Sequence, residues 1–370
     1  MLENSPVKLF DMKARTEKYH DVFLAACNRV LSSSNLVLGE ENQKFESAFA
    51  DYLVVKHVTG VANGSDALEL ALLAFDLPIG SEIGLAANCG GYSTSAILRN
   101  SLVPVYCDVD VKTSLPTLDS IASLIRSGVK AIIATHLYGY AIPEIEKISE
   151  LCKSSGVLLL EDCAQSHGAK INGKSAGTFG DAACFSFYPT KNLGSMGDAG
   201  AVVTNNDAIA QRVRSLRTYG WADKYVINLR NGKNSRMDEI QAAFLFEILP
   251  HLDDENLRRR EIANRYLKEI NSKKVALNHN LDASYVAHLF VLQCEQRSEF
   301  MSHLAKFEIG SGIHYPVPDH LQKAWQGLFK VNSVLTATEF LAQTIVTLPC
   351  HPYMMEQDVT RVISVVNNFG

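Results

Sequence analysis

At the middle of the chain stands Phe185-Ser186-Phe187-Tyr188-Pro189-Thr190-Lys191-Asn192-Leu193-Gly194, an aromatic and apolar run that leads into a lysine. Its beginning, Ala182 to Ser186, has the length and composition of a buried strand. Glycines follow at position 194 and in Gly197-Asp198-Ala199-Gly200, where the backbone can approach a ligand closely. A lysine held among apolar groups loses the solvation of its ammonium form, so its pKa falls and its amine becomes a nucleophile for carbonyl carbons. The alternative is an ordinary surface lysine, and the stretches upstream decide between the two.

A second buried strand ends in an acid. Gly156-Val157-Leu158-Leu159-Leu160 is a continuous apolar run, typical of a parallel strand covered on both faces, and Glu161-Asp162 follows it. Ligands of open α/β sheets bind at the carboxyl ends of the strands, where Asp162 would project. An acid there and a buried lysine nearby match the needs of pyridoxal 5′-phosphate, whose carbonyl bonds to the lysine and whose ring nitrogen stays protonated beside the acid. Taken alone, such an acid is equally well a structural residue or a helix cap.

A phosphate site is predicted at the start of a helix. His57 to Ala62 reads as a strand, Asn63-Gly64-Ser65-Asp66 follows, and Ala67 to Ala74 reads as an apolar helix. A Gly-Ser pair at a helix start presents free backbone N–H groups, a hydroxyl and the positive end of the helix dipole. The alternative is a plain N-cap by Ser65 or Asp66. Because an acid repels phosphate, we expect Asp66 to cap the helix or to lie to one side.

With these pieces in place, the chain resembles the DegT/DnrJ/EryC1/StrS family of pyridoxal-phosphate aminotransferases, which act on nucleotide-linked keto-sugars. Order and spacing agree from Phe10-Asp11-Met12-Lys13 to Leu348-Pro349-Cys350-His351-Pro352, so the resemblance covers essentially the whole chain. The motifs that carry it are Asn63-Gly64-Ser65-Asp66-Ala67-Leu68, His136-Leu137-Tyr138-Gly139, Glu161-Asp162-Cys163-Ala164-Gln165-Ser166-His167-Gly168, Ser186 to Gly194, Asn234-Ser235-Arg236-Met237-Asp238-Glu239-Ile240-Gln241-Ala242-Ala243 and His314-Tyr315-Pro316-Val317-Pro318.

The resemblance implies a role for each cofactor-binding residue. Lys191 would form the Schiff base and move the proton between substrate and cofactor. Asp162 would pair with the pyridine nitrogen, and Gln165 would lie against the ring or its hydroxyl. Asn234 would reach the phosphate of the neighbouring subunit, which implies a homodimer with shared active sites; a loop or cap role is the alternative. The residues expected to hold the phosphate within one chain are Gly64, Ser65 and Ser186.

One position departs from the family pattern. Members usually carry an aromatic residue that covers the outer face of the cofactor ring, and Ala87-Asn88-Cys89-Gly90-Gly91-Tyr92 has Gly90 there. Three alternatives follow: Tyr92 stacks on the ring instead, the loop backbone covers it, or a substrate group fills the space. Consecutive glycines permit unusual backbone paths, and we favour Tyr92.

The substrate side is less defined. In similar proteins the motif with His314, Tyr315 and His320 lies near the sugar nucleotide. Arg236 would bind a diphosphate through two parallel hydrogen bonds or form a structural salt bridge. His136 and His167 are candidates for the rim of the site or for structural histidines.

The predicted fold is α/β: a fold-type-I aminotransferase with a large domain (residues 1–245) built on a mostly parallel, seven-stranded sheet and a smaller α+β C-terminal domain (246–370). Apolar runs that alternate with helical patterns support the parallel sheet. They are Ser81 to Ala86, Val103 to Cys107, Ala131 to Ala134, Val157 to Leu160, Ala182 to Ser186 and Ala201 to Thr204. Met237 to Ile270 reads as helical, and the region from Asn278 to the C-terminus shows a strand at Val286 to Gln293 and two helices.

Composition excludes several classes of function. A net charge of −5 without a long basic stretch argues against a nucleic-acid partner. Eight cysteines without a Cys-x-x-Cys pair suggest reduced thiols and no zinc, and no histidine pattern indicates a metal. Nucleotide-binding Gly-x-Gly-x-x-Gly and P-loop motifs are absent from the sequence. Residues 1–6 begin no signal peptide, and no apolar run is long enough for a membrane span, so we expect a cytoplasmic enzyme.

The sequence therefore predicts a transaminase that moves an amino group, by resemblance from glutamate, to a nucleotide-linked keto-deoxysugar. Its product would be an amino sugar for a surface polysaccharide or a secondary metabolite. A dehydratase of the same fold is one alternative, but such enzymes replace the lysine by histidine, and this chain retains Lys191. An aminotransferase for a small amino acid and a non-catalytic, cofactor-binding sensor are the others.

Overall fold

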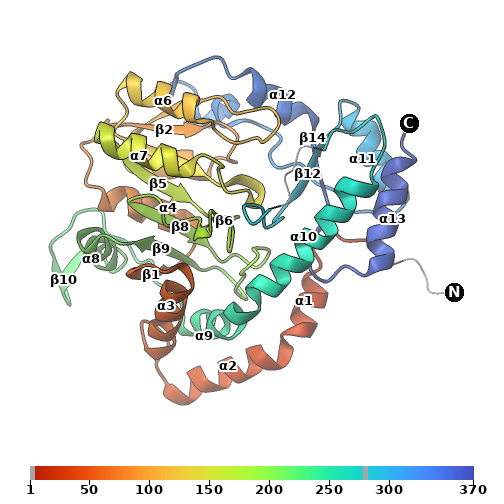
Figure 1. Ribbon diagram of the computed structural model, residues 1–370. Coiled ribbons are helices and arrows are strands. Elements are labelled where there is room, and N and C mark those ends of the chain that lie inside the picture. Colours follow the sequence, from red (N-terminus) through yellow and green to blue (C-terminus); the bar gives the residue numbers. More distant parts are fainter. Residues whose placement is uncertain (1–4, 278–281) are drawn as a thin grey trace.

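An eight-stranded sheet forms the centre of the molecule (Figure 1), in the order β1-β9-β8-β5-β4-β2-β3-β13. The structure is a computed structural model and describes residues 5–277 and 282–370. Only β9 runs against its neighbours, so the sheet is mostly parallel, as predicted. The strands are β1 (His57–Val61), β2 (Glu82–Ala86), β3 (Val103–Cys107), β4 (Ala131–Thr135), β5 (Leu158–Asp162), β8 (Ala182–Ser186), β9 (Gly200–Thr204) and β13 (Lys330–Val331).

Seven of these strands lie within residues 57–204 and correspond to the predicted sheet. The eighth, β13, comes from the C-terminal part of the chain and pairs parallel with β3. A two-residue strand leaves no periodic signal in a sequence, which is why it was not predicted.

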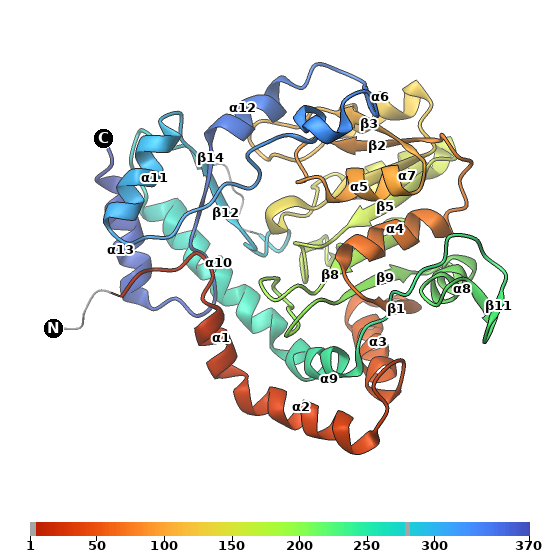
Figure 2. The ribbon, with the colours of Figure 1, turned by 180° about the vertical axis from the view of Figure 1, so that it is seen from behind.

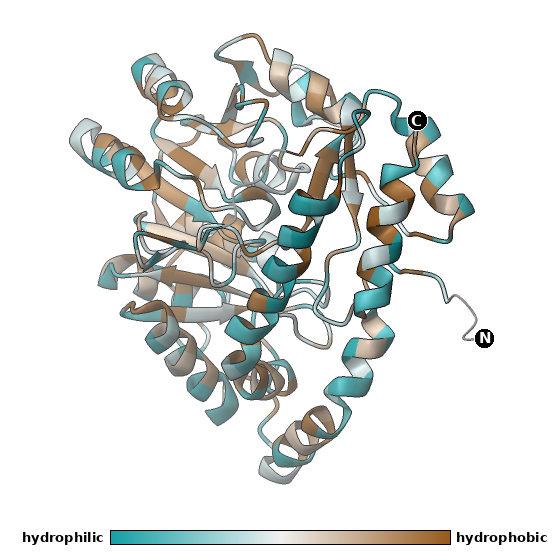
Figure 3. Cartoon of the chain, turned by 45° about the vertical axis from the view of Figure 1, so that its right-hand side comes forward, coloured by the Kyte–Doolittle hydropathy of each residue, from teal (hydrophilic) through white to brown (hydrophobic). Residues whose placement is uncertain are grey.

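Helices cover both faces of the sheet. Figures 1 and 2, seen from opposite sides, show α6 (Leu118–Ser127) and α7 (Ile145–Ser155) on one face and α4 (Gly64–Ala74), α5 (Tyr92–Arg99) and α8 (Asp207–Leu216) on the other. Successive strand side chains point to opposite faces, so in β4 Ile132 joins one apolar core and Ile133 the other. In Figure 3 the strands are mostly apolar, whereas the outer helices carry apolar and polar stripes.

Most of the remaining elements precede or follow residues 57–204 in the chain. The N-terminal helices are α1 (Met12–Lys18), α2 (His20–Ser33) and α3 (Glu40–Leu53), and α2 and α3 pack on α9 (Glu239–Ile248). From α9 the chain continues through a 3₁₀ turn (Leu249–His251) and α10 (Leu252–Glu269). It then forms β12 (Phe290–Gln293), α11 (Arg297–Lys306), α12 (Thr336–Thr344), β14 (Ile345–Leu348) and α13 (Glu356–Asn367). Short elements complete the chain: 3₁₀ turns at Leu137–Gly139, Asp319–Leu321 and Lys323–Trp325, and the pairs β6 (Lys170–Ile171) with β7 (Lys174–Ser175) and β10 (Trp221–Asp223) with β11 (Val226–Ile227).

Two predictions for the C-terminal part need correction. The strand predicted at residues 286–293 forms only over Phe290–Gln293, because Val286 and Leu289 donate their N–H groups to the loop carbonyls of Gly139 and Tyr138. Three α-helices follow residue 282 instead of two, since α12 is too short for a clear periodic pattern. The predicted start of this part, Asn278, lies outside the described residues.

The domain boundary at residue 245 stays a prediction; that residue lies inside α9. Within residues 5–277 and 282–370, no helix combines the length and the hydrophobicity required to cross a bilayer.

The start of α3 is held by a single buried carboxylate from the first turn of α9. Glu239 is 1% exposed and accepts hydrogen bonds from the N–H groups of Gly39 (2.8 Å), Glu41 (2.9 Å) and Asn42 (3.0 Å). A helix start leaves such N–H groups unpaired and carries a partial positive charge, so a carboxylate satisfies both needs. This contact joins the N-terminal helices to α9.

We expect Glu239→Ala to lower the free energy of unfolding by about 3 kcal/mol or more, because it leaves three buried N–H groups without an acceptor. The matched control is Glu247→Ala on the same helix, which removes a half-exposed ion pair with Arg29 (2.7 Å) and is expected to cost under about 1 kcal/mol. Urea unfolding of both variants measures the difference. Equal destabilisation would contradict the capping role of Glu239.

Candidate active site

A cavity of about 740 Å³ opens at the carboxyl ends of β5 and β8. Asp162 and Ser186 are the last residues of these strands, and Lys191 follows in the loop after β8. Ten of the thirteen residues predicted for the site line this cavity: Gly64, Ser65, Asp66, Tyr92, Asp162, Gln165, Ser186, Lys191, His314 and Tyr315. The strand ends converge here because parallel neighbours finish at the same edge of a sheet.

Lys191 is a poor ammonium ion in this position. Burial lowers its pKa to about 8, and the nearby carboxylate of Asp162 opposes that shift. At pH 7 about a tenth of the molecules therefore carry a neutral amine at this position, far more than for a lysine of ordinary pKa. This is the form that attacks a carbonyl carbon.

Asp162 is a buried acid in the same cavity as Lys191. Burial raises the pKa of its carboxyl group, while hydrogen bonds from the Ala164 N–H (3.1 Å) and the Ser93 hydroxyl (3.3 Å) and the charge of Lys191 favour its ionised form. A buried carboxylate of this kind is well suited to a cationic group in the cavity, such as a protonated ring nitrogen.

Gln165 has a defined orientation. Its Oε1 accepts the N–H of Tyr138 (2.6 Å), so its Nε2 points the other way and donates to the Tyr315 hydroxyl (3.1 Å). Tyr138 in turn donates its hydroxyl to the carbonyl of His314. Gln165 therefore ties the strand end at β5 to the segment that carries His314 and Tyr315.

The start of α4 forms a close cradle with the end of β8. A Cβ atom on Gly64 would lie only 2.5 Å from Cβ of Ser186, so no larger residue fits there. Neither the Gly64 nor the Ser65 N–H has a recorded hydrogen bond in the described part of the chain. These donors and the two serine hydroxyls match the chemistry of a phosphate group.

Neither Ser65 nor Asp66, the two alternatives considered for the N-cap, caps this helix. Asn63 is the N-cap, and its Oδ1 accepts the N–H of Asp66 (2.8 Å). Because α4 already begins at Gly64, Ser65 and Asp66 lie inside its first turn and cannot be the residue that precedes it. The carboxylate of Asp66 instead pairs with Lys233 (2.7 Å), in agreement with the alternative that it lies to one side of the phosphate site. This ion pair neutralises the charge with which Asp66 would repel an anion.

Above Gly90 lies the ring of Tyr315. A Cβ atom on Gly90, whose φ is +74°, would approach this ring to 2.8 Å, so an aromatic side chain at position 90 has no room. Tyr92 is 52% exposed and contacts Tyr315 edge to face, with 6.2 Å between ring centroids. Both tyrosines line the cavity, and the stacking role of Tyr92 stays a prediction.

Three predicted residues lie away from the cavity. Asn234 is exposed and forms a β-bridge with Thr218, and Arg236 is partly exposed nearby. His320 is buried against Tyr106 and contacts Glu339 (3.0 Å). Their roles in cofactor or substrate binding stay predictions.

Several cavity residues were missed by sequence reasoning. Lys233 stands beside the predicted Asn234, and Arg99 ends α5. Asp198 follows the lysine loop, and its glycine-rich surroundings were a usable signal. His288 comes from a segment far along the chain and had no local motif.

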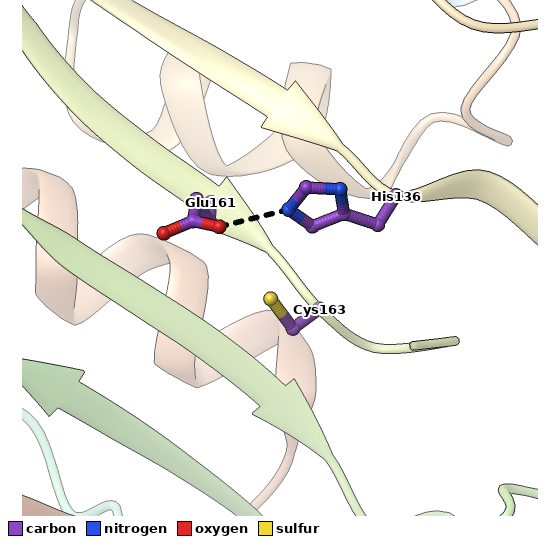
Figure 4. A group of neighbouring side chains, drawn as sticks. All are labelled: His136, Glu161 and Cys163. Carbon is purple, nitrogen blue, oxygen red and sulfur yellow. Dashed lines mark hydrogen bonds and ion pairs between the residues drawn. The ribbon is translucent and has the colours of Figure 1, made fainter. Parts of the chain in front are cut away.

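One group of metal-ligand type lies behind the cavity. Figure 4 shows His136 hydrogen-bonded to Glu161, with Cys163 beside them. The Glu161 oxygens also accept the N–H groups of Gly177 (2.8 Å), Phe179 (2.7 Å) and Gly180 (2.7 Å). His136 Nδ1 accepts the Ile142 N–H (3.0 Å), so its ring proton points to Glu161.

These hydrogen bonds occupy the lone pairs that a metal would need, and burial raises the pKa of the Cys163 thiol well above its usual value. The group is a structural clamp on the end of β5, which settles His136 as a structural histidine. His167 is also structural: it packs on Phe185 and Phe187, and burial lowers its pKa to about 3.

The residues present fit pyridoxal phosphate. The cradle at Gly64 supplies donors for a phosphate, the buried Asp162 needs a cation, and Lys191 offers an amine of lowered pKa within the same cavity.

Comparisons with known proteins place the chain among known aminotransferases. The model of the DegT/DnrJ/EryC1/StrS aminotransferase family matches residues 18–367. The dTDP-3-amino-3,6-dideoxy-α-D-galactopyranose transaminase of Aneurinibacillus thermoaerophilus is 41% identical over 368 residues, which cover 98% of this chain and 99% of that protein. The structure of DesV from Streptomyces venezuelae matches with a TM-score of 0.94 and 36% identity, covering 98% of both chains. NtdA from Bacillus subtilis, solved with the bound cofactor PMP, matches with a TM-score of 0.86 and 27% identity over 97% of this chain and 82% of that one.

We expect cofactor-free protein to capture pyridoxal phosphate at a rate that rises about tenfold per pH unit below pH 8 and levels off above it, because only the neutral amine of Lys191 reacts. Stopped-flow absorbance measures this rate. Asp162→Asn removes the charge that raises the pKa of Lys191, so its midpoint moves to lower pH.

Asp198→Asn is the matched control, since Asp198 is an exposed acid of the same cavity wall. Its midpoint is expected to stay near that of the wild type. A midpoint near the usual lysine value in the wild type would contradict the burial of Lys191.

Proposed function

Because the chain belongs to the DegT/DnrJ/EryC1/StrS aminotransferase family, we propose that it transfers an amino group from glutamate to a nucleotide-linked keto-deoxysugar. The observation that carries this proposal is the single cavity that holds Lys191, Asp162 and the helix start at Gly64. Its volume of about 740 Å³ leaves space for a sugar beside the cofactor. The product is an amino sugar for a surface polysaccharide or a secondary metabolite.

Each residue has a role in this proposal. Pyridoxal phosphate, when bound, supplies the carbonyl that reacts with amines and a ring that accepts electrons from the substrate carbon. Lys191 would hold the cofactor through its carbonyl, and its free amine would carry the proton at the substrate carbon. Asp162 would keep the ring nitrogen protonated, and Gln165 would lie against the ring or its hydroxyl. The groups that bind the phosphate are Gly64, Ser65 and Ser186, with Asp66 neutralised by Lys233.

The substrate side follows from the outer part of the cavity. Tyr92, His314 and Tyr315 line it and would contact the sugar, and His320 would act from the same segment. Arg236 would bind the diphosphate. The exposed cation Arg99 on the same wall adds to the attraction for an anionic substrate.

A homodimer with shared sites completes the proposal. Asn234 is exposed and absent from the cavity of its own chain, which is the arrangement expected of a residue that acts in the neighbouring subunit. All eight cysteines are free, which favours a reducing compartment such as the cytoplasm.

The first test is the visible absorbance of the protein with pyridoxal phosphate, before and after glutamate, beside Lys191→Ala. We expect a yellow band that glutamate bleaches in the wild type and that is absent in the variant. A band that resists glutamate and every other amino acid would contradict transamination and favour a sensor. Loss of a sugar hydroxyl without amine transfer, with a keto-sugar as substrate, would indicate a dehydratase.

The shared site is tested by mixing two inactive variants, Lys191→Ala and Asn234→Asp, after unfolding and refolding them together. A mixed dimer then has one site free of both changes, so random pairing restores about a quarter of wild-type activity. If Asn234 acts within its own chain, every site stays damaged and no activity returns. Size-exclusion chromatography confirms that the variants pair.

A further inference from the structure

The two glycines in the loop after β2 support aromatic rings from a distant part of the chain. A Cβ atom on Gly90 would lie 2.8 Å from Cε2 and Cζ of Tyr315 and 2.9 Å from its Cδ2. A Cβ atom on Gly91 would lie 2.5 Å from the ring of Trp325. Both glycines have positive φ, +74° and +83°, which strains any other residue. Position 90 therefore cannot supply an aromatic side chain, for lack of room and because of its backbone conformation.

The Tyr315 ring lies flat on this loop. Three neighbouring ring atoms are almost equally distant from the Cβ position of Gly90, so that position stands over a face of the ring and not at its edge. Tyr315 is also partly exposed and lines the active-site cavity. Because one face is taken by the loop, the ring borders the cavity from its far side.

The hydroxyl of Tyr315 is held beside the predicted cofactor site. Gln165 accepts the Tyr138 N–H through Oε1 (2.6 Å) and donates from Nε2 to the Tyr315 hydroxyl (3.1 Å). The second hydrogen of this Nε2 is available to another acceptor. Burial raises the pKa of the Tyr315 hydroxyl, and the charge of Asp162 adds to this, so Tyr315 and Asp162 border the same space.

The segment after Tyr315 is fixed to the same loop and to α5. The Asp319 N–H donates to the Ala87 carbonyl (2.8 Å), and the buried Asp319 carboxylate accepts the Thr94 hydroxyl (2.6 Å). The loop is in turn joined to β5, since Ser93 donates to Asp162 (3.3 Å). The position of the Tyr315 ring is therefore set by contacts on several sides.

We propose that Tyr315 covers the outer face of the cofactor ring, in the place where a side chain at position 90 would otherwise lie. The proposal rests on the proposed function, in which Asp162 pairs with the ring nitrogen and Gln165 lies against the ring or its hydroxyl. The face of an aromatic side chain stabilises an electron-poor, protonated ring and keeps water from it.

This role replaces the expected stacking of Tyr92. That side chain is 52% exposed and meets Tyr315 edge to face, with 6.2 Å between ring centroids. It is therefore not held flat against the cavity by the protein, as Tyr315 is. Contact of Tyr315 with the sugar is compatible with this role, because the sugar is bound beside the cofactor.

The affinity of cofactor-free protein for pyridoxamine phosphate tests the proposal. This compound lacks the carbonyl that bonds to Lys191, so its dissociation constant reports on the binding of ring and phosphate alone. We expect Tyr315→Ala to raise this constant about tenfold, measured by calorimetry. Tyr315→Phe retains the ring and loses only the hydrogen bond with Gln165, so its constant is expected to stay within about threefold of the wild type.

Tyr92→Ala is the matched comparison, because it removes a tyrosine of the same cavity that contacts Tyr315 only edge to face. Its dissociation constant is expected to stay within about threefold of the wild type. An unchanged constant in folded Tyr315→Ala, equal losses in Tyr315→Ala and Tyr315→Phe, or a larger loss in Tyr92→Ala would overturn the proposal. Failure of the wild type to bind pyridoxamine phosphate would instead overturn the proposed function.

A spectroscopic measurement covers the case in which Tyr315→Ala does not fold. Fluorine NMR of cofactor-free protein labelled with 3-fluorotyrosine reports on each tyrosine, and the loss of one signal in Tyr315→Phe identifies that of Tyr315. A nucleus above the face of an aromatic ring is shifted upfield. We expect pyridoxamine phosphate to shift the Tyr315 signal upfield and inorganic phosphate to leave it in place. A Tyr315 signal that pyridoxamine phosphate does not move upfield would overturn the proposal.

Discussion

The burial of two opposite charges in one cavity is the constraint on which the site depends. Lys191 and Asp162 each lose solvation, and each is partly compensated by the charge of the other. The lysine is left with an amine that reacts near neutral pH, and the acid is left in need of a cation. Neither effect would arise at the protein surface, where water screens both groups. The packed apolar walls of the sheet are therefore part of the chemistry.

Much of this arrangement was predictable from the sequence, because the residues at the carboxyl ends of buried parallel strands form the ligand site of such a sheet. Leu158–Asp162 and Ala182–Ser186 are recognisable as buried strands, and parallel strands bring their carboxyl ends to one edge. Asp162 follows from that rule, Lys191 from the apolar run that precedes it, and Ser186 from the resemblance to the family. The parallel sheet itself and its covering helices were likewise predicted from alternation of apolar runs and helical patterns.

The rest depends on contacts between distant segments. His288 reaches the cavity because residues 286–289 bond to a loop near Gly139, and nothing in the local sequence signals that pairing. The same pairing shortened the predicted strand to Phe290–Gln293. The N-cap of α4 could not be chosen from the sequence for a different reason: Asn63, Ser65 and Asp66 are all good capping residues, and only geometry selects Asn63. Tyr315 lies over Gly90 through a contact that no spacing rule could reveal.

The short strand β13 has a consequence for how the protein is made. Lys330 and Val331 pair with Val105 and Tyr106, so part of the outer edge of β3 is covered by residues synthesised more than two hundred positions later. Until they leave the ribosome, that edge presents unpaired N–H and C=O groups to other chains, which is the usual starting point of aggregation. Chains truncated before residue 330 would therefore be released with an unpaired strand edge that can bind other chains. Pairing of β13 with β3 is thus a late step that protects the sheet edge of the newly made protein.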